Sequence, residues 1–426
     1  MDIQELNVLL TRIGPGTPCG ELMRRYWQPA ALSEELPPGR APVPVHLLGE
    51  DLVLFRDEQG RAGLLGLHCA HRGADLSYGR LEDGGLRCLY HGWLYDVTGQ
   101  CLEQPGEPAG STFKDRVRQR AYPCVERAGA IFAYLGPGEP PPLPPYDFLH
   151  APDGHVAATK AWQECSYLQA NEGNLDTSHL SYMHLVSARF HPRGLPGNDP
   201  IPRRGLAPGL ETAEVELMPF GLRSAKLRRD FGPDAYELLT ADFLLPNAAA
   251  FFLGPRGDTS SRFGYSVHYH VPIDDTRHWK YVFRYSRHEP FPADEPLWRY
   301  ETERYRPVTS AANRYGQDRA RMQWDSYTGM GPDFHEHDQW ATETMGAIPS
   351  FAREHFGALD LAITVSRKLL VKAIEDVQQG RDPAGVVRAP SGQCFPVVPY
   401  CGPVPAGKPW RVFNRELEAE VYGQHA

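Results

Sequence analysis

Hydrophobic and polar positions follow different periods in different parts of the chain. Apolar residues recur at helical spacing in residues 1–13, and a Gly-Pro-Gly run ends this predicted helix. Residues 40–135 instead contain short β-like runs separated by glycine and proline turns, which predicts a small β domain. Within it, residues 43–48 and 52–55 predict two neighbouring strands.

A proline-rich stretch separates this β domain from the rest of the chain. Six prolines in residues 137–145 predict a stiff linker and mark the clearest domain boundary. Beyond it we expect a helix over residues 163–183, in spite of Gly173. Further strands and helices are expected as follows: strands of an antiparallel sheet at 243–253, 263–271 and 279–285, and helices at 336–347 and 359–378.

Composition narrows the class of protein. A chain of 426 residues has room for two or three domains, and 41% hydrophobic residues suffice for a sizeable core. The net charge of −9 argues against nucleic acid as a partner. Apolar runs are shorter than the ~20 residues that span a bilayer, and the first residues lack a basic signal start. Eight cysteines in so long a chain favour reduced thiols, so we expect a cytoplasmic protein without a membrane partner.

Two short motifs carry the clearest chemistry. Cys69-Ala-His71 is followed, after sixteen residues, by Cys88-Leu-Tyr-His91. Two thiolates on one iron and two imidazoles on the other are the ligands of a Rieske [2Fe–2S] cluster. A structural zinc site is the alternative, but zinc sites keep like ligands together, whereas each motif here mixes one Cys with one His. The pattern therefore predicts a redox protein.

A second metal site is predicted in residues 171–184. Asp176 and His179 are three positions apart, so they share one face of a helix. His184 follows His179 by five positions, about 140° around a helix, so both could face one ion only if the helix ends or loosens after His179. Two histidines and one carboxylate form the facial triad of non-heme Fe(II) oxygenases. Taken alone, such a segment is more often a surface or core helix than a metal site, but its position after the Cys-His motifs and the linker favours the metal site.

The third ligand must come from elsewhere in the chain. Residues 335–343 form the densest remaining cluster of ligand-type side chains. Asp338 is the favoured carboxylate, with Glu336 and Glu343 as alternatives, although acidic residues also suit an ordinary helix start. The histidines of this cluster receive no role. A His-Tyr-His run at 268–270 places two imidazoles on one strand face, but without a carboxylate it favours an ordinary sheet face.

With these motifs in place, the chain resembles the Rieske non-heme iron ring-hydroxylating oxygenases, specifically α subunits of the phthalate dioxygenase-like group. The resemblance extends over nearly the whole length. It is carried by Arg12-Ile-Gly-Pro-Gly-Thr-Pro, Arg24-Arg-Tyr-Trp-Gln-Pro, the two Cys-His motifs, residues 171–184, Gln317-Asp-Arg, Tyr327-Thr-Gly, Asp338, Glu343-Thr-Met-Gly and Glu354-His-Phe-Gly.

The resemblance implies a fold and an assembly. The fold would be α+β, with an N-terminal Rieske β domain and a C-terminal catalytic domain in which helices frame an antiparallel sheet. We expect an N-terminal helical segment at 1–39 packed on the catalytic domain, the Rieske domain at 40–145 and the catalytic domain at 146–426. The family forms head-to-tail homotrimers, in some cases stacked as hexamers, so a neighbouring subunit is an expected partner.

The resemblance also implies residue roles. His179, His184 and Asp338 would bind the mononuclear Fe(II). Asp176 would be the carboxylate that bridges this site to a Rieske histidine of the neighbouring subunit. Family members often carry Gln or another polar residue before the ligand Asp. This chain has His337 at that position, so it departs from the family pattern directly beside Asp338.

The predicted function is that of a terminal oxygenase. The chain has no convincing dinucleotide fingerprint, so electrons from NAD(P)H would arrive through a separate reductase, alone or with a ferredoxin. Seven arginines follow the second metal segment, and arginine suits a bidentate grip on a carboxylate, so a small aromatic acid is a plausible substrate with O2. Arg204 is taken as the substrate-binding candidate, although most of these arginines also suit solvent or a subunit interface. The seven are Arg189, Arg193, Arg203, Arg204, Arg223, Arg228 and Arg229.

The sequence leaves several hypotheses about the reaction open. Dihydroxylation of an aromatic acid and monooxygenation, including O- or N-demethylation, use the same metal ligands. An electron-transfer Rieske protein would leave the chain beyond residue 146 without a role. A zinc hydrolase with a structural zinc domain would be colourless.

Overall fold

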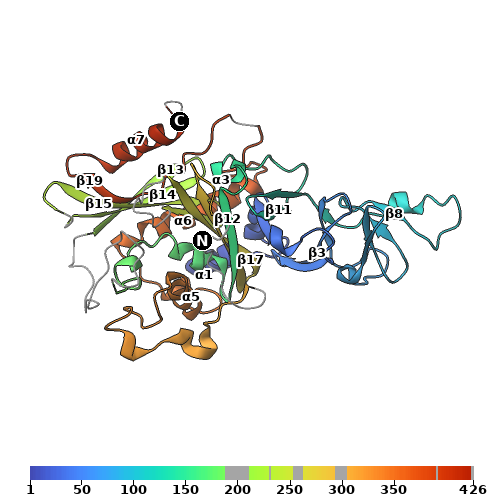
Figure 1. Ribbon diagram of the computed structural model, residues 1–426, viewed down its shortest axis with the longest axis horizontal. Coiled ribbons are helices and arrows are strands. Elements are labelled where there is room, and N and C mark those ends of the chain that lie inside the picture. Colours follow the sequence, from blue (N-terminus) through green and yellow to red (C-terminus); the bar gives the residue numbers. More distant parts are fainter. Residues whose placement is uncertain (188–210, 230–231, 253–261, 293–304, 390–391, 424–426) are drawn as a thin grey trace.

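The computed structural model describes residues 1–187, 211–229, 232–252, 262–292, 305–389 and 392–423. The molecule is elongated, with a small β unit at one end of its long axis and a larger body of sheet and helices at the other (Figure 1). A shared hydrophobic core runs from the N-terminal helices through the base of the β unit into the large sheet. All eight cysteines are free thiols. In the described part of the chain, no helix has the length and apolar character needed to cross a bilayer.

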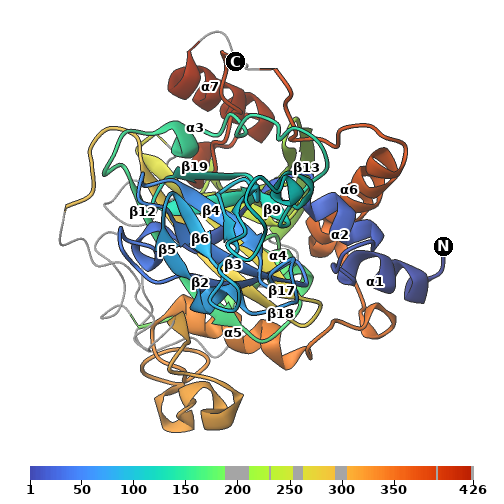
Figure 2. The same ribbon diagram turned by 90° about the vertical axis from the view of Figure 1, so that its right-hand side faces the viewer.

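The N-terminal residues fold against the larger body. Helix α1 (Ile3–Thr11) begins at Asp2, whose carboxylate accepts from the Glu5 amide while Glu5 accepts from the Asp2 amide, so the start of the helix is capped on both sides. Helix α2 (Pro18–Met23) follows, and both helices contact α6 (Leu361–Gln378) (Figure 2). The helix expected in residues 1–13 is therefore confirmed.

Three small antiparallel sheets build the β unit. Their strand orders are β1–β11–β10, β2–β3–β4–β9 and β5–β6–β7–β8. The strands are β1 (Trp27–Leu32), β2 (Val43–Leu47), β3 (Glu50–Arg56), β4 (Ala62–Gly66), β5 (Arg80–Glu82), β6 (Gly85–Arg87), β7 (Leu94–Tyr95), β8 (Cys101–Glu103), β9 (Ala121–Tyr122), β10 (Cys124–Arg127) and β11 (Ala130–Tyr134). The two strands expected at 43–48 and 52–55 are β2 and β3. The β5–β6 hairpin turns at Asp83 and Gly84, both with positive φ, which is the backbone twist that tight hairpins favour.

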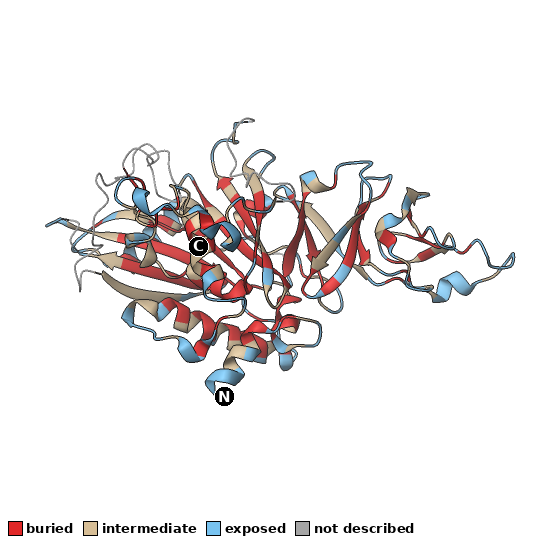
Figure 3. Cartoon of the chain, turned by 90° about the horizontal axis from the view of Figure 1, so that it is seen from below, coloured by how far each residue is buried: buried red, intermediate tan, exposed pale blue. Residues whose placement is uncertain are grey.

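The larger body is built on one eight-stranded antiparallel sheet. Its order is β12–β18–β17–β16–β15–β14–β13, and β19 pairs with β15. The strands are β12 (Val156–Gln163), β13 (Glu211–Met218), β14 (Gly221–Arg228), β15 (Ala235–Leu244), β16 (Ala248–Phe252), β17 (Gly264–Asp274), β18 (Arg277–Ser286) and β19 (Cys401–Pro405). The helices are α3 (Asp147–His150), α4 (Tyr167–Gly173), α5 (Phe334–Thr344), α6 and α7 (Trp410–Tyr422). The sheet is buried along most of its length (Figure 3).

Two sequence-based expectations about these elements are wrong. Residues 163–183 are not one helix, because Gln163 still pairs with His278 in the sheet and α4 ends at Gly173. After it, the Asp176 carboxylate accepts from the Ser178 amide, a local bond that competes with helix formation. Residues 243–252 are not one strand either, because Pro246, which follows a cis peptide bond and has no N–H, separates β15 from β16. Residue 253 lies outside the described part.

The other expected elements of the larger body are confirmed to within a few residues. Residues 263–271 and 279–285 correspond to β17 and β18, which pair antiparallel through a long hairpin. Residues 336–347 and 359–378 correspond to α5 and α6. The fold class is therefore α+β, as expected.

Candidate functional site

The first candidate site lies in two similar loops of the β unit. After β4, the Cys69 amide donates to the Ala74 carbonyl at 2.8 Å; after β6, the Cys88 amide donates to the Trp93 carbonyl at 2.8 Å. Both cysteines are 3% exposed and belong to a second hydrophobic core that is separate from the large one. The two loops therefore bring residues nineteen positions apart to the same place.

The two histidines of the loops lie next to each other. The ring centroids of His71 and His91 are 4.4 Å apart, and His71 stacks on Trp93 at 4.4 Å. His71 Nδ1 is buried and has no hydrogen-bond partner among the described residues. An unpaired buried nitrogen is costly, so this atom fits a metal ligand. The four side chains together suit a [2Fe–2S] cluster.

Neighbouring polar side chains support the first loop. The hydroxyl of Tyr95 lies 3.3 Å from Cys69 Sγ, and burial raises the pKa of Tyr95, so the phenol keeps a proton to donate to sulfur. The Gln119 amide donates to the carbonyls of Gly66 and His68 at 2.7 and 2.9 Å. These contacts fix the loop that carries Cys69 and His71.

The second candidate site begins just after α4. His179 opens a short 3₁₀ turn, His179–Ser181, and the Met183 amide donates back to the His179 carbonyl at 2.8 Å. The chain then reaches His184 on a turn, and the Ser187 amide donates to the Asp325 carbonyl at 2.9 Å. The expected turn is present, but the helix ends six residues before His179 rather than after it.

Three side chains from distant parts of the sequence converge at this site. His184 Nε2 lies 3.1 Å from Asp338 Oδ1, and His179 Nε2 lies 3.7 Å from the same oxygen. The metal-binding atoms of the three residues all lie within 4.8 Å of one another. Asp338 stands in the second turn of α5, which Asp333 caps by accepting from the His335 amide. Two imidazole nitrogens and one carboxylate oxygen are the donors that a facial-triad iron requires.

The charges around this site favour an ionised carboxylate. Burial acts to raise the pKa of Asp338, but His184, Lys280 and His179 outweigh it and hold this pKa well below its usual range. Burial lowers the pKa of His184, which keeps its imidazole neutral and able to bind a metal.

Asp176 and the alternative carboxylates are placed differently. Asp176 Oδ2 lies 3.8 Å from His179 Nδ1, on the side of the ring away from Asp338, and its side chain is 31% exposed. Glu343 accepts from the Tyr315 hydroxyl and the Glu164 amide, so it is engaged elsewhere. Glu336 does not belong to the converging group in the described residues.

Two further polar residues at this site were given no role from the sequence. Lys280 on β18 is 2% exposed, and its Nζ lies 3.0 Å from His335 Nδ1 and 3.8 Å from Asp338 Oδ2. His337 Nδ1 lies 3.3 Å from His184 Nδ1. The available signal was a lysine inside an otherwise apolar strand pattern, since buried lysines need a specific partner. The His268 ring also lies 5.5 Å from His335, so its strand face borders this site rather than an ordinary core.

The arginines proposed for substrate binding are only partly described. Arg204, with Arg189, Arg193 and Arg203, lies outside the described residues. Arg223 is fully buried, where it donates to Asp242 and Glu418, so it is a structural ion pair of the sheet and not a free anion site. Arg228 pairs with Glu237 at 3.2 Å.

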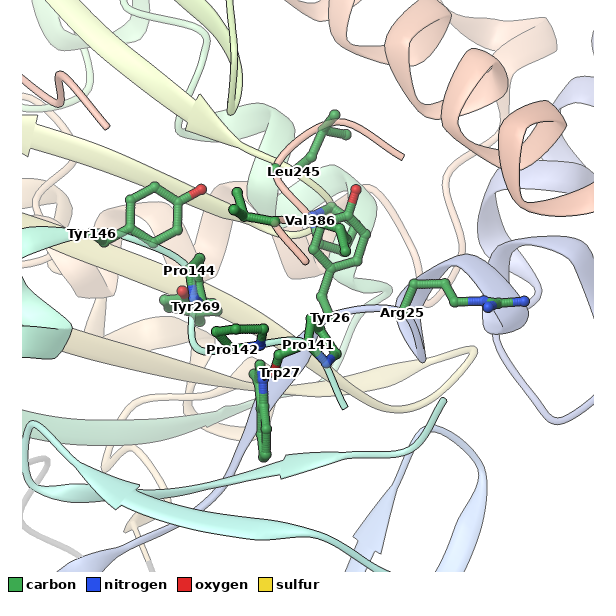
Figure 4. Close-up of a pocket in the computed structure, with 13 residues that line it drawn as sticks. Arg25, Tyr26, Trp27, Pro141, Pro142, Pro144, Tyr146, Leu245, Tyr269 and Val386 are labelled. Atoms are coloured by element: carbon green, nitrogen blue, oxygen red, sulfur yellow. Dashed lines mark hydrogen bonds between the residues drawn. The ribbon is translucent and has the colours of Figure 1, made fainter. Parts of the chain in front are cut away.

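A small pocket lies away from both sites. It is lined by residues next to the proline-rich linker, among them Tyr26, Trp27, Pro141, Tyr146 and Val386 (Figure 4). It includes none of the residues that form the two candidate sites.

Two protein-family models and several known proteins match this chain. Residues 26–122 match the Rieske [2Fe-2S] domain model, and residues 133–425 match the LigXa C-terminal domain like model. The oxygenase subunit of phthalate 4,5-dioxygenase from Pseudomonas putida is 35% identical over 398 residues, covering 89% of this chain and 88% of that protein. The chain belongs to the Rieske oxygenase family.

Other relatives of this Rieske oxygenase differ in reaction. The oxygenase subunit of 5,5'-dehydrodivanillate O-demethylase from Sphingobium sp. is 32% identical and covers 91% of this chain and 84% of the relative. Among solved structures, the oxygenase in the ferredoxin complex of carbazole 1,9a-dioxygenase has a TM-score of 0.59 at 23% identity, covering 91% of this chain and 96% of that chain. Dicamba monooxygenase has a TM-score of 0.58 at 19% identity, covering 84% and 99%. These structures share the fold.

As a Rieske oxygenase, the chain uses a [2Fe–2S] cluster and a mononuclear non-heme iron. It is a terminal oxygenase subunit, and its relatives belong to aromatic ring-hydroxylating or demethylating systems.

Proposed function

We propose that this Rieske oxygenase adds oxygen from O2 to a small aromatic acid. The observation that carries the proposal is the convergence of His179, His184 and Asp338 within 4.8 Å in a chain that also contains a Rieske domain. These three residues hold the Fe(II) ion, and the cluster is held by Cys69, His71, Cys88 and His91. When bound, the facial-triad iron supplies open positions for O2, and the cluster supplies stored electrons.

The protein groups have separate tasks at the iron site. The Asp338 carboxylate stays ionised and directs Oδ1 toward the two imidazoles. Asp176 is the bridging carboxylate: it is beside His179 Nδ1 and partly exposed, so it can contact a histidine of another subunit. A carboxylate on the far side of a ligand imidazole also orients that ring.

Electron transfer requires a second subunit in this proposal. The cluster loops lie near β8 at one end of the molecule, whereas α5 lies in the larger body (Figure 1). Leu89 and Tyr90, next to the cluster ligands, are 60% and 57% exposed and lie side by side in the sequence. They suit a subunit interface, so the chain assembles as a head-to-tail homotrimer, alone or stacked as a hexamer.

The electron donor is a separate NAD(P)H-dependent reductase, alone or with a ferredoxin. The chain has no dinucleotide fingerprint in its sequence, and the oxygenase of carbazole 1,9a-dioxygenase forms a complex with a ferredoxin. The exposed cluster loops leave His91 accessible to such a donor.

The substrate proposal rests on the relatives and on Arg204. Phthalate and 3-chlorobenzoate, which appear in the names of relatives at 35% and 31% identity, are both aromatic acids. Arg204 binds the carboxylate in this proposal. Demethylation of an aromatic ether is the second candidate, since a relative at 32% identity is named an O-demethylase.

The metal assignment is tested by counting iron. Asp338→Ala should remove one iron per chain, retain the visible spectrum of the cluster and abolish product formation. Glu336→Gln, on the same helix, is the matched control and should retain all three irons. If Asp338→Ala keeps its full iron content, the ligand set is wrong.

The reaction is tested by labelling. Purified oxygenase with a reductase and a panel of aromatic acids is supplied with 18O2. Two labelled oxygens in a cis-diol identify dihydroxylation, and an unlabelled phenol with released formaldehyde identifies demethylation. If no acid is consumed while electrons still flow to O2, the proposed substrate class is wrong.

A further inference from the structure

His337 is a buried histidine without a role in the proposed function. It stands beside Asp338 on α5 and is 0% exposed. One of its ring nitrogens, Nε2, lies 3.0 Å from the Gly331 carbonyl, and the other, Nδ1, lies 3.3 Å from His184 Nδ1. Both nitrogens of this ring are therefore engaged, one by backbone and one by a residue of the iron site.

The facing rings have the geometry of a hydrogen bond. The planes of His184 and His337 are 18° apart, and their centroids are separated by 5.4 Å. Because the two Nδ1 atoms are much closer than the centroids, the edges that carry these nitrogens face each other. A nitrogen separation of 3.3 Å between nearly parallel rings allows one N–H to point at the other lone pair.

The partners fix the direction of this bond. A carbonyl oxygen can only accept, so His337 Nε2 carries the proton and His337 Nδ1 offers a lone pair. On the other ring, Nε2 of His184 faces Asp338 Oδ1 at 3.1 Å and is the nitrogen that can bind a metal. When a metal is bound, that nitrogen is unprotonated, so the single proton of the neutral ring lies on His184 Nδ1 and is donated to His337.

We propose that His337 is a positioning residue that holds the ring and the tautomer of His184 for metal binding. The inference rests on the ligand set proposed above. The Gly331 carbonyl orients His337, His337 accepts from His184, and His184 presents Nε2 beside Asp338. Because both nitrogens of His337 are already engaged, its ring acts through His184 and does not reach the reacting atoms.

The two ligand histidines then differ in what supports them. Metal-bound imidazoles usually donate their second N–H to a carboxylate, a carbonyl or water, and a carboxylate makes the ligand more basic. His179 has the Asp176 carboxylate beside its Nδ1 at 3.8 Å, whereas His184 has a neutral imidazole. The iron site is therefore built from one ligand with an anionic neighbour and one with a neutral neighbour.

The test measures Fe(II) affinity of the full-length, cluster-loaded protein by competition with a coloured chelator. His337→Leu removes the acceptor and should weaken Fe(II) binding by about 10- to 100-fold. In His337→Gln the side-chain oxygen can accept from His184 while its NH2 group donates to Gly331, so affinity should stay within about threefold of the wild type. Gln339→Leu, another buried polar-to-apolar change on α5, is the control and should leave affinity unchanged.

The outcomes separate this inference from the ligand set. If His184→Ala keeps wild-type Fe(II) affinity, the ligand set fails and this inference fails with it. If His184→Ala loses Fe(II) but His337→Leu does not, the inference alone is overturned. Equal losses in His337→Leu and His337→Gln would also overturn it, because packing rather than a hydrogen bond would then be responsible.

A second measurement does not depend on the Leu variant folding. The wild-type protein carrying Co(II) at the mononuclear site should show two exchangeable, paramagnetically shifted N–H proton signals, one from each ligand histidine. His337→Gln should move one of these signals and leave the other in place. If both signals are unaffected, His337 does not accept from a ligand imidazole and the proposal is wrong.

Discussion

The hydroxyl of Tyr95 is expected to raise the reduction potential of the cluster. It lies 3.3 Å from Cys69 Sγ in the small core, and Tyr95 is 0% exposed. A donor to a cluster sulfur stabilises the reduced state, which carries one more negative charge, and hydrogen bonds to the sulfurs are among the features that set these potentials. Tyr95→Phe removes this donor and keeps the ring.

The size of the effect follows from the strength of such a bond. A hydrogen bond to a charged group contributes about 1.5–3 kcal/mol, and both redox states keep negative charge on sulfur, so we take about 1 kcal/mol as the difference between them. For a one-electron couple about 1.4 kcal/mol corresponds to about 59 mV. Tyr95→Phe should therefore lower the potential by about 40 mV.

The assay is a redox titration followed by the visible and circular dichroism bands of the cluster. Tyr90→Phe is the matched control, because the Tyr90 ring is exposed and lies against His91 with centroids 3.8 Å apart rather than against a sulfur. Its potential should change by less than about 10 mV. An unchanged or higher potential in Tyr95→Phe, with an intact cluster spectrum, would refute the reasoning.

Three further outcomes are expected. Asp176→Asn should keep both metals but lower NADH-coupled turnover by at least about tenfold; near-normal turnover with full metal content would place the bridge elsewhere. Burial acts to raise the pKa of Glu50, but hydrogen bonds, that from Tyr122 first, lower it below its ordinary value of 4.5. The ionised Glu50 carboxylate therefore contributes to the free energy of unfolding above that value, and this contribution is lost as the pH falls through the lower folded pKa. In urea, the free energy of unfolding of Glu50→Gln should depend less on pH in this acidic window than that of the wild type. Arg367→Met leaves the buried Glu172 without its partner at 2.6 Å and should lower the free energy of unfolding by about 3–5 kcal/mol; a loss below about 1 kcal/mol would contradict this.

The cluster ligands could be predicted from the sequence because they lie close together along the chain. Cys69 and His71 share one short loop, as do Cys88 and His91, and each loop is closed by backbone bonds within a few residues. The intervening β5–β6 hairpin turns at Asp83-Gly84, a dipeptide that favours such a turn. Alternating strands and the long helix α6 were predicted for the same reason, since their periodicity is visible in a short window.

The second site could be predicted only in part. The spacing of Asp176, His179 and His184 implied a turn, but apolar periodicity does not show that α4 ends at Gly173 or that Asp176 then makes a local bond. Asp338 could not be separated from Glu336 and Glu343 by pattern alone. What distinguishes it is how α5 is placed relative to the 3₁₀ turn, and tertiary packing sets that placement.

The same limit applies to the polar residues that support the iron site. Lys280 and His337 are informative only once the structure shows that they are buried beside Asp338 and His184. In the sequence, a lysine in a strand and a histidine in a charged helix are equally compatible with a solvated face. Burying a polar side chain costs free energy unless that side chain has a hydrogen-bonding or charged partner, and only the tertiary structure shows which residue is the partner.

These supports explain how an irregular segment can present metal ligands. Between the end of α4 and His184 the chain forms only the short 3₁₀ turn His179–Ser181 and no longer helix or strand. A run of buried side-chain bonds ties it to the sheet instead: Asn174 lies 2.8 Å from His270, His270 2.9 Å from His278, and His278 2.7 Å from the Cys165 carbonyl. Burial lowers the pKa of both histidines, so these bonds are made by neutral rings. The polar face of the large sheet therefore holds the ligand segment in place, as a continuous helix would otherwise do. Removing one of these hydrogen bonds should increase local opening of the ligand segment before it unfolds the domain.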